Sequence, residues 1–148
     1  MQITRRSFIG SSTATLGTLA LGAPAVLGQA KSRVVVVGGG PGGATAAKYI
    51  AKDAKGAIEV TLVEPSKQFV TCFHSNLYVG GFKSMENITH SYDKLAAAHG
   101  IKLNHQAAAS IDRDKKEVTL ADGSVLGYDR LVLSPGIDLK YDSVPGWG

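Results

Sequence analysis

The chain has 148 residues, with 16 lysines and arginines against 12 aspartates and glutamates, and a formal net charge of +4 at pH 7. This charge is small and no basic residues are clustered, so the composition does not predict a nucleic-acid-binding protein. The length is enough for one domain of modest size.

Residues 1–30 have the pattern of an export signal. Arg5 and Arg6 precede a weakly apolar stretch of glycine, alanine, serine and threonine that runs to Leu27 and is followed by Gly-Gln-Ala. Two adjacent arginines and a cleavage site of small residues predict a twin-arginine signal peptide that is cleaved after residue 30. The alternative is an uncleaved membrane anchor, which the glycines and hydroxyl groups of the stretch disfavour.

Cleavage leaves residues 31–148, with 14 basic and 12 acidic residues. The twin-arginine route carries folded proteins, which suits a protein that acquires its cofactor before it leaves the cytoplasm. We therefore expect this part to work in the bacterial periplasm, with no stable membrane anchor after cleavage.

Four consecutive valines predict a buried parallel strand over residues 33–37. The spacing Gly38-x-Gly40-x-x-Gly43 follows at once, and residues 42–54 are compatible with a helix. This order of strand, glycine turn and helix predicts a dinucleotide site, with the pyrophosphate at the start of the helix. The candidate cofactor-binding residues of the turn are Gly38, Gly39, Gly40, Pro41, Gly42 and Gly43.

The apolar run over residues 58–63 predicts a second parallel strand, which completes a βαβ unit. Glu64 closes this strand, where an acidic side chain can accept a hydrogen bond from a ribose hydroxyl. A carboxylate repels a 2′-phosphate, so NAD or FAD is favoured over NADP. A tight turn that binds no ligand is the alternative.

The middle of the chain carries weaker signals. We expect a loop over residues 64–72, a short helical turn over 74–80, a helix capped by Thr89 or Ser91 and ended by Gly100, and a third strand over 101–103.

A small antiparallel sheet is predicted beside the parallel one. Residues 117–120 and 124–126 flank the pair Asp122-Gly123, which is a strong hairpin signal, and residues 107–113 supply a further strand.

Residues 130–133 are apolar enough to return to the parallel sheet, and Ser134-Pro135-Gly136 ends that strand. A second glycine turn at the carboxyl end of a parallel strand gives another place where the backbone can meet a dinucleotide. Pro135 and Gly136 are therefore candidate cofactor-binding residues, although proline and glycine also form turns without a ligand.

Cys72 is the only cysteine, so the chain cannot close an internal disulfide. An unpaired thiol in an exported protein indicates burial, pairing elsewhere or a reactive group, and the place of Cys72 after the second strand favours the last. No metal site is predicted, because metal-ligand spacing is absent from the four histidines, His74, His90, His99 and His105, which we expect at the surface or half buried.

Two segments resemble one known family. Residues 63–81, VEPSKQFVTCFHSNLYVGG, and residues 128–138, YDRLVLSPGID, are similar to the flavoprotein subunit of flavocytochrome c sulfide dehydrogenase, as is the twin-arginine leader. The cluster Thr-Cys-x-x-Ser-Asn followed by Gly-Gly is the most specific part, although Phe73 and His74 depart from the family motif. The resemblance covers essentially all 148 residues and about the N-terminal third of a full subunit.

This resemblance implies a Rossmann-like α/β fold that binds FAD, as a fragment of a larger flavoprotein with two dinucleotide-binding domains. Cys72 matches the cysteine that forms a thioether to the 8α-methyl carbon of FAD. Sulfide would give electrons to this flavin, which passes them to the haem of a c-type cytochrome subunit. The family's redox-active cysteine pair has no counterpart in residues 1–148, so no catalytic residue is assigned in this segment.

Two other classes share the glycine turn. A sulfide:quinone reductase or a type II NADH dehydrogenase has the same fold but delivers electrons at a membrane. A non-catalytic module would bind FAD or NAD without reacting with sulfide.

Overall fold

The computed structural model describes residues 30–146. The predicted signal peptide lies outside the described residues, apart from its last residue. Within the described part, none of the helices has the length and hydropathy needed to span a membrane.

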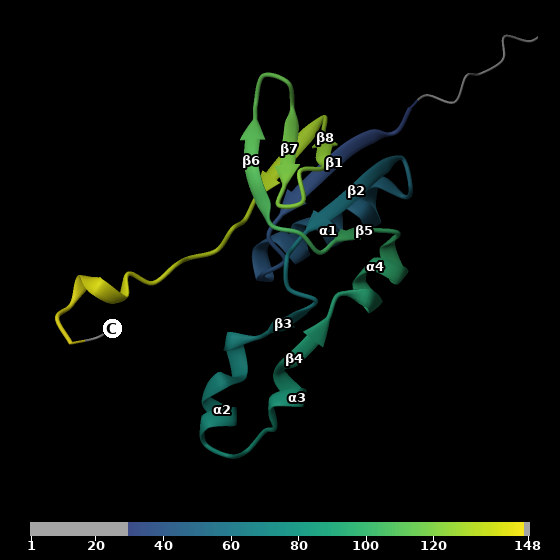
Figure 1. Cartoon of the computed structure of the whole chain (residues 1–148). Coiled ribbons are helices and arrows are strands. Elements are labelled where there is room, and N and C mark those ends of the chain that lie inside the picture. Colours follow the sequence, from purple (N-terminus) through teal and green to yellow (C-terminus); the bar gives the residue numbers. More distant parts are fainter. Residues whose placement is uncertain (1–29, 147–148) are drawn as a thin grey trace, which may run out of the picture.

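A four-stranded parallel sheet forms the centre of the molecule (Figure 1). Its strands are β1 (Ser32–Val37), β2 (Ile58–Val63), β5 (Lys102–Asn104) and β9 (Arg130–Leu133), in the order β5-β2-β1-β9. The strands predicted over 33–37, 58–63, 101–103 and 130–133 are confirmed to within one residue. The chain leaves β1 in one direction to form β2 and β5, whereas β9 pairs on the other side, so the order reverses at β1.

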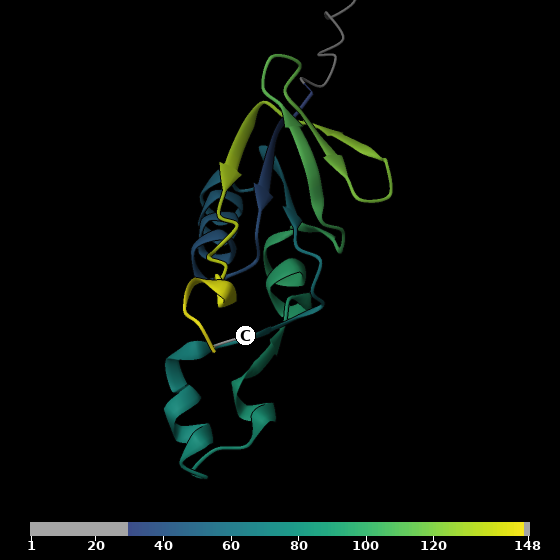
Figure 2. The ribbon, with the colours of Figure 1, turned by 60° about the vertical axis from the view of Figure 1, so that its left-hand side comes forward.

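The alternating side chains of β1 are buried in two different cores. Val34 and Val36 pack with Ala47 and Ala51 of α1 (Pro41–Ala54), whereas Val35 packs with the antiparallel strands on the opposite face. Figure 2 shows this arrangement, with the helix and the antiparallel strands on opposite sides of the parallel sheet. Both faces of the sheet are therefore covered, as its run of valines requires.

The predicted antiparallel meander is confirmed. Its strands are β6 (Ala108–Asp112), β7 (Glu117–Leu120) and β8 (Val125–Gly127), in that order. Val118 and Leu120 of β7 are at most 1% exposed and pack with Val63 and Tyr128. Burial of each such side chain contributes about 1.5–3 kcal/mol.

Residues 68–91 form an arm that extends beyond the carboxyl ends of the parallel strands (Figure 1). Two short antiparallel strands, β3 (Gln68–Val70) and β4 (Thr89–Ser91), form its base. Between them lie the short helices η1 (Cys72–His74), α2 (Ser75–Val79) and α3 (Met85–Ile88). The helical turn predicted over 74–80 is present, whereas the predicted loop over 64–72 contains β3.

The predicted cap of the next helix is wrong. Thr89 and Ser91 belong to β4, and the helix, α4 (Asp93–His99), follows Tyr92 and ends at Gly100 as expected. Tyr92 makes no side-chain cap to α4, because its ring is buried and its hydroxyl bonds elsewhere.

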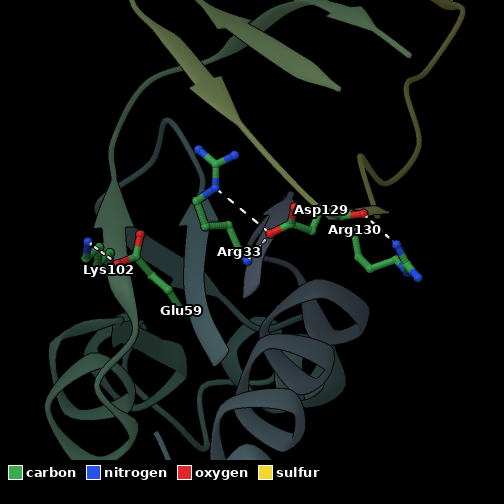
Figure 3. A network of polar contacts seen from close by, with 5 residues as sticks. All are labelled: Arg33, Glu59, Lys102, Asp129 and Arg130. Carbon is green, nitrogen blue, oxygen red and sulfur yellow. Dashed lines mark hydrogen bonds and ion pairs between the residues drawn. The ribbon is translucent and has the colours of Figure 1, made fainter. Parts of the chain in front are cut away.

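Polar contacts connect the amino ends of the strands (Figure 3). The Arg33 backbone N–H donates to Asp129 Oδ2 at 2.6 Å, and Lys102 Nζ lies 2.6 Å from Glu59 Oε2. Exposed pairs of this kind contribute about 0.2–1 kcal/mol. They lie at the edge opposite the glycine turn, so they fix the strands without occupying the carboxyl edge.

Candidate functional site

Two turns meet at the carboxyl edge of the parallel sheet. The Gly38 N–H donates to the Val63 carbonyl at 2.8 Å, and the Ser134 N–H donates to the Val37 carbonyl at 2.8 Å. Gly38 has a φ of +100°, and a Cβ on it would overlap the Ser134 carbonyl. The turn after β1 is therefore in contact with the turn after β9, at the point where the strand order reverses.

Close packing also explains the third glycine of the pattern. A Cβ on Gly43, in the first turn of α1, would overlap the Gly38 carbonyl oxygen. Helix and turn can approach this closely only because residue 43 has no side chain.

The amino end of α1 presents free donors to the same edge. Within the described part of the chain, the backbone N–H groups of Gly40, Gly42 and Gly43 have no hydrogen-bond partner, and Pro41 has no N–H. A Cβ on Gly40 would meet no atom within 4 Å, so its backbone is open to a ligand. Free amides and the positive end of a 14-residue helix favour an anionic group here.

Glu64 lies directly against the glycine turn. Its Oε2 accepts the Gly39 N–H at 2.7 Å, and its Oε1 accepts the Ser66 N–H at 2.9 Å. Each carboxylate oxygen can accept a second hydrogen bond, so the half-buried side chain keeps capacity for a ribose hydroxyl.

One pocket of about 380 Å³, the turn pocket, brings half of the predicted cofactor-binding residues together. The sequence-predicted residues that line it are Gly38, Gly40, Glu64, Pro135 and Gly136. Ser66, Gln68, Phe69, Val70, Tyr92 and Ser134 complete the lining.

A second pocket of about 320 Å³, the aromatic pocket, adjoins the first. The two pockets share Gly40, Phe69 and Tyr92. Its other lining residues are Gly39, Pro41, Ala44, Thr45, Phe73, His90, Ser91 and Leu95. The aromatic and aliphatic side chains suit a flat, apolar ring system.

Cys72 is exposed and unpaired at the start of η1, in the arm. It does not line either pocket, but Phe73, the next residue, lines the aromatic pocket. Thr71 fixes this segment, because its hydroxyl accepts the Phe73 N–H at 3.3 Å and its side chain is buried. Cys72 is thus the sequence neighbour of a residue that lines the aromatic pocket, and its thiol is exposed.

Tyr92 is the main residue of the site that the sequence did not reveal. It is 5% exposed, and its hydroxyl donates to the Gly39 carbonyl at 3.0 Å. Burial raises the pKa of the Tyr92 hydroxyl, and the Glu64 carboxylate raises it further, so the group stays a donor at neutral pH. Its position before α4 follows no spacing rule, so no pattern could have identified it.

The histidines are spread over the structure. His74 and His90 are exposed, and His99 and His105 are half buried. His105 Nδ1 lies 3.1 Å from the Glu64 carbonyl oxygen. Among residues 30–146, histidine, cysteine, aspartate and glutamate form no group of three that could hold a metal ion.

Residues 32–147 match the sequence profile of the family described as pyridine nucleotide-disulphide oxidoreductase. The chain belongs to this family. The family and its flavoprotein members imply FAD as the cofactor. The site fits this group, since Gly40, whose N–H has no partner in the described residues, lines both pockets, and aromatic side chains line the second one. Gly42 and Gly43 line neither pocket.

Several members of this oxidoreductase family are similar to the chain. The sulfide dehydrogenase [flavocytochrome c] flavoprotein chain of Chlorobaculum thiosulfatiphilum is 64% identical over 44 residues, which are 30% of this chain and 90% of that one. The probable ferredoxin reductase CtmF of Castellaniella defragrans is 33% identical over 120 residues, which are 80% of this chain and 29% of that one.

Among solved structures, the sulfide:quinone oxidoreductase of Aquifex aeolicus superposes with a TM-score of 0.67 at 30% identity. The superposition covers 74% of this chain and 25% of that one. The chain thus spans less than a third of the ferredoxin reductase and of this structure. The α/β fold predicted from the sequence is confirmed, as is membership in an FAD-dependent oxidoreductase family with sulfide-related members.

Proposed function

We propose that this chain is the FAD-binding part of a sulfide dehydrogenase, which passes electrons from sulfide through FAD to a c-type cytochrome subunit. The 64% identity to the Chlorobaculum flavoprotein chain over 44 residues supports this reaction. The observation that carries the proposal is an exposed, unpaired cysteine next in sequence to Phe73, which lines a pocket that shares Gly40 with the turn pocket. It connects a cofactor site to a residue able to hold the cofactor covalently.

Bound FAD supplies the redox chemistry, because a flavin can accept two electrons and release them one at a time. The residues of this chain supply position. The free amides of Gly40, Gly42 and Gly43 would bind the pyrophosphate, and Glu64 would accept hydrogen bonds from a ribose. The aromatic side chains of the second pocket, Phe69, Phe73 and Tyr92, would contact the flavin end.

Cys72 is proposed to bond through its Sγ to the 8α carbon of the flavin. A thiolate is a good nucleophile when it is held close to the carbon that it attacks. The Cys72 sulfur would replace one hydrogen of the 8α methyl group, and the two electrons and two protons released would be taken up by the flavin ring, which the c-type cytochrome then reoxidises. Phe73, the residue after Cys72, lines the aromatic pocket, and the Cys72 thiol is exposed and unpaired. A covalent bond would retain the cofactor in a compartment that does not supply FAD.

The proposed partner is a separate cytochrome subunit, because the chain has no Cys-x-x-Cys-His sequence for its own haem. The proposed location is the periplasm, on the basis of the twin-arginine pattern at Arg5 and Arg6. The proposed substrate is sulfide, on the basis of the sulfide-related members of the family.

A sulfide:quinone reductase is the second candidate, and the likeness to the Aquifex aeolicus structure favours it. The two candidates differ in the electron acceptor. A cytochrome accepts single electrons in the aqueous phase, whereas a quinone is reduced at a membrane.

The chain alone is not expected to be active, so anaerobic titration with sulfide of the full-length flavoprotein, of which this chain is proposed to be the N-terminal part, tests the proposal. We expect sulfide to bleach the flavin absorbance, and added c-type cytochrome to restore it without quinone. Flavin that is reoxidised only by a quinone would favour the second candidate. Flavin that sulfide does not bleach would identify a non-catalytic module and contradict both.

A further inference from the structure

The backbone of Gly39 is held from both sides by residues that are distant in the sequence. Its N–H donates to Glu64 Oε2 at 2.7 Å, and its carbonyl accepts the Tyr92 hydroxyl at 3.0 Å. Both partners come from outside the glycine turn, since Glu64 follows β2 and Tyr92 precedes α4. Glycine has the most freedom of any residue in the unfolded chain, so consecutive glycines at 38–40 gain their shape from such contacts.

The contact from Tyr92 also fixes the next amide. The Gly39 carbonyl and the Gly40 N–H belong to one planar trans peptide unit, in which the two groups point in opposite directions. A carbonyl held toward Tyr92 therefore directs the Gly40 N–H to the other side. That N–H has no partner in the described part of the chain, and Gly40 lines both pockets.

We propose that Tyr92 is a positioning residue of the cofactor site, whose hydroxyl orients the Gly39–Gly40 peptide so that the Gly40 amide faces the pyrophosphate of FAD. This inference rests on the FAD site proposed above. Tyr92 acts through the backbone of Gly39, and its ring forms part of the wall that the two pockets share.

The space around Gly39 gives independent support. A Cβ on Gly39 would lie 2.6 Å from the Tyr92 hydroxyl oxygen, 2.8 Å from the ring carbon that carries it, and 2.8 Å from Glu64 Cγ. The turn thus has glycine at this position because Tyr92 and Glu64 close around it.

Tyr92 also packs in the core with Val36, Leu62 and Ile101, so its effect on folding must be separated from its effect on the turn. Replacement of Tyr92 by phenylalanine keeps the ring and removes only the donor. Tyr128 provides a matched control, because it is 7% exposed but packs in the other core, with Val35 and Val118.

The experiment uses the full-length flavoprotein with Cys72→Ala. This substitution removes the proposed covalent bond, so that FAD binds reversibly. Dissociation constants for FAD are measured by flavin fluorescence, and those for ADP, which carries the same pyrophosphate, by competition. We expect Tyr92→Phe to weaken the binding of both about five- to tenfold. Tyr128→Phe should leave both constants unchanged, and replacement of Tyr92 by 4-aminophenylalanine, which keeps a donor, should restore them.

Melting temperatures of the cofactor-free proteins distinguish positioning from stability. If Tyr92→Phe changes neither the affinity for FAD nor the affinity for ADP, the inference is overturned, whatever the melting temperature. An equal loss in Tyr128→Phe would overturn it as well. If the Cys72→Ala protein binds no FAD, the proposed cofactor site fails together with the inference, whereas tight binding unaffected by Tyr92→Phe refutes the inference alone.

Discussion

At the scale of single residues, Gly40 and Gly43 of the same turn have different roles. Gly43 packs against the Gly38 carbonyl, where a side chain has no room. Gly40 has a φ of −65° and a ψ of −175°, which alanine adopts readily, and open space lies around its α carbon. Packing therefore explains glycine at position 43, whereas only the approach of a ligand explains it at position 40.

Alanine substitutions at these two positions should separate folding from binding. We expect Gly43→Ala to destabilise the protein by about 1–3 kcal/mol, because its methyl group would overlap the turn. Gly40→Ala should change the free energy of unfolding by less than about 1 kcal/mol but weaken FAD binding about tenfold or more. Chemical denaturation and FAD titration of the two variants in the Cys72→Ala background check this. Unchanged FAD affinity in Gly40→Ala would show that the cofactor does not approach this backbone.

The elements that follow local rules could be predicted from the sequence. The valine run gives β1, the glycine spacing gives the turn and the start of α1, and Asp122-Gly123 gives the β7–β8 hairpin. Each of these signals lies within a few consecutive residues.

The base of the arm could not be predicted, because its strands have three residues each and pair across a long insertion. The pairing of β3 with β4 brings Phe69 and His90 together and leads the chain to Tyr92. The aromatic half of the site depends on this distant pairing. The other half, at Gly40, Glu64 and Pro135, was predictable because parallel strands end at one edge.

The β7–β8 hairpin should make stability depend on pH. Hydrogen bonds from the Ser124 hydroxyl and backbone N–H lower the pKa of the Asp122 carboxyl in the folded protein. A lowered pKa gives stabilisation that is complete well above the unfolded value of about 3.9 and is lost as the pH falls through the folded value.

Melting temperatures at pH 6 and pH 3 check this expectation. The loss caused by Asp122→Ala should be larger at pH 6 than at pH 3. Ser124→Ala removes the hydroxyl, one of the two donors. It should lower the melting temperature less than Asp122→Ala does, and again more at pH 6 than at pH 3. An Asp122→Ala effect that is equal at both pH values would contradict the assigned role of the carboxylate.

At the scale of the whole molecule, the exposed apolar side chains are unevenly distributed. Val79 and Phe82 of the arm are 83% and 82% exposed, and Ile137, after β9, is 94% exposed. The parallel sheet, in contrast, is covered on both faces. The glycine turn thus lies at the edge of the well-packed parallel sheet, whereas Cys72 belongs to the arm.

Export of the whole protein is predicted to depend on the arginine pair. Replacement of Arg5 and Arg6 by lysine keeps the charge but removes the twin-arginine signal, so we expect the protein to stay in the cytoplasm. Fractionation of bacterial cells and N-terminal sequencing of the exported protein, expected to begin at Lys31, check this. A lysine variant that still reaches the periplasm would contradict the predicted route.

The proposed covalent bond between Cys72 and the flavin is tested most directly by mass spectrometry of the tryptic peptide that contains this residue. The protein is purified from its native host and digested with trypsin in the absence of a reducing agent. We predict a peptide mass increased by that of FAD, or of its FMN breakdown product, with the modification at Cys72. An unmodified peptide whose thiol is freely alkylated, from a protein without yellow colour, would contradict the account.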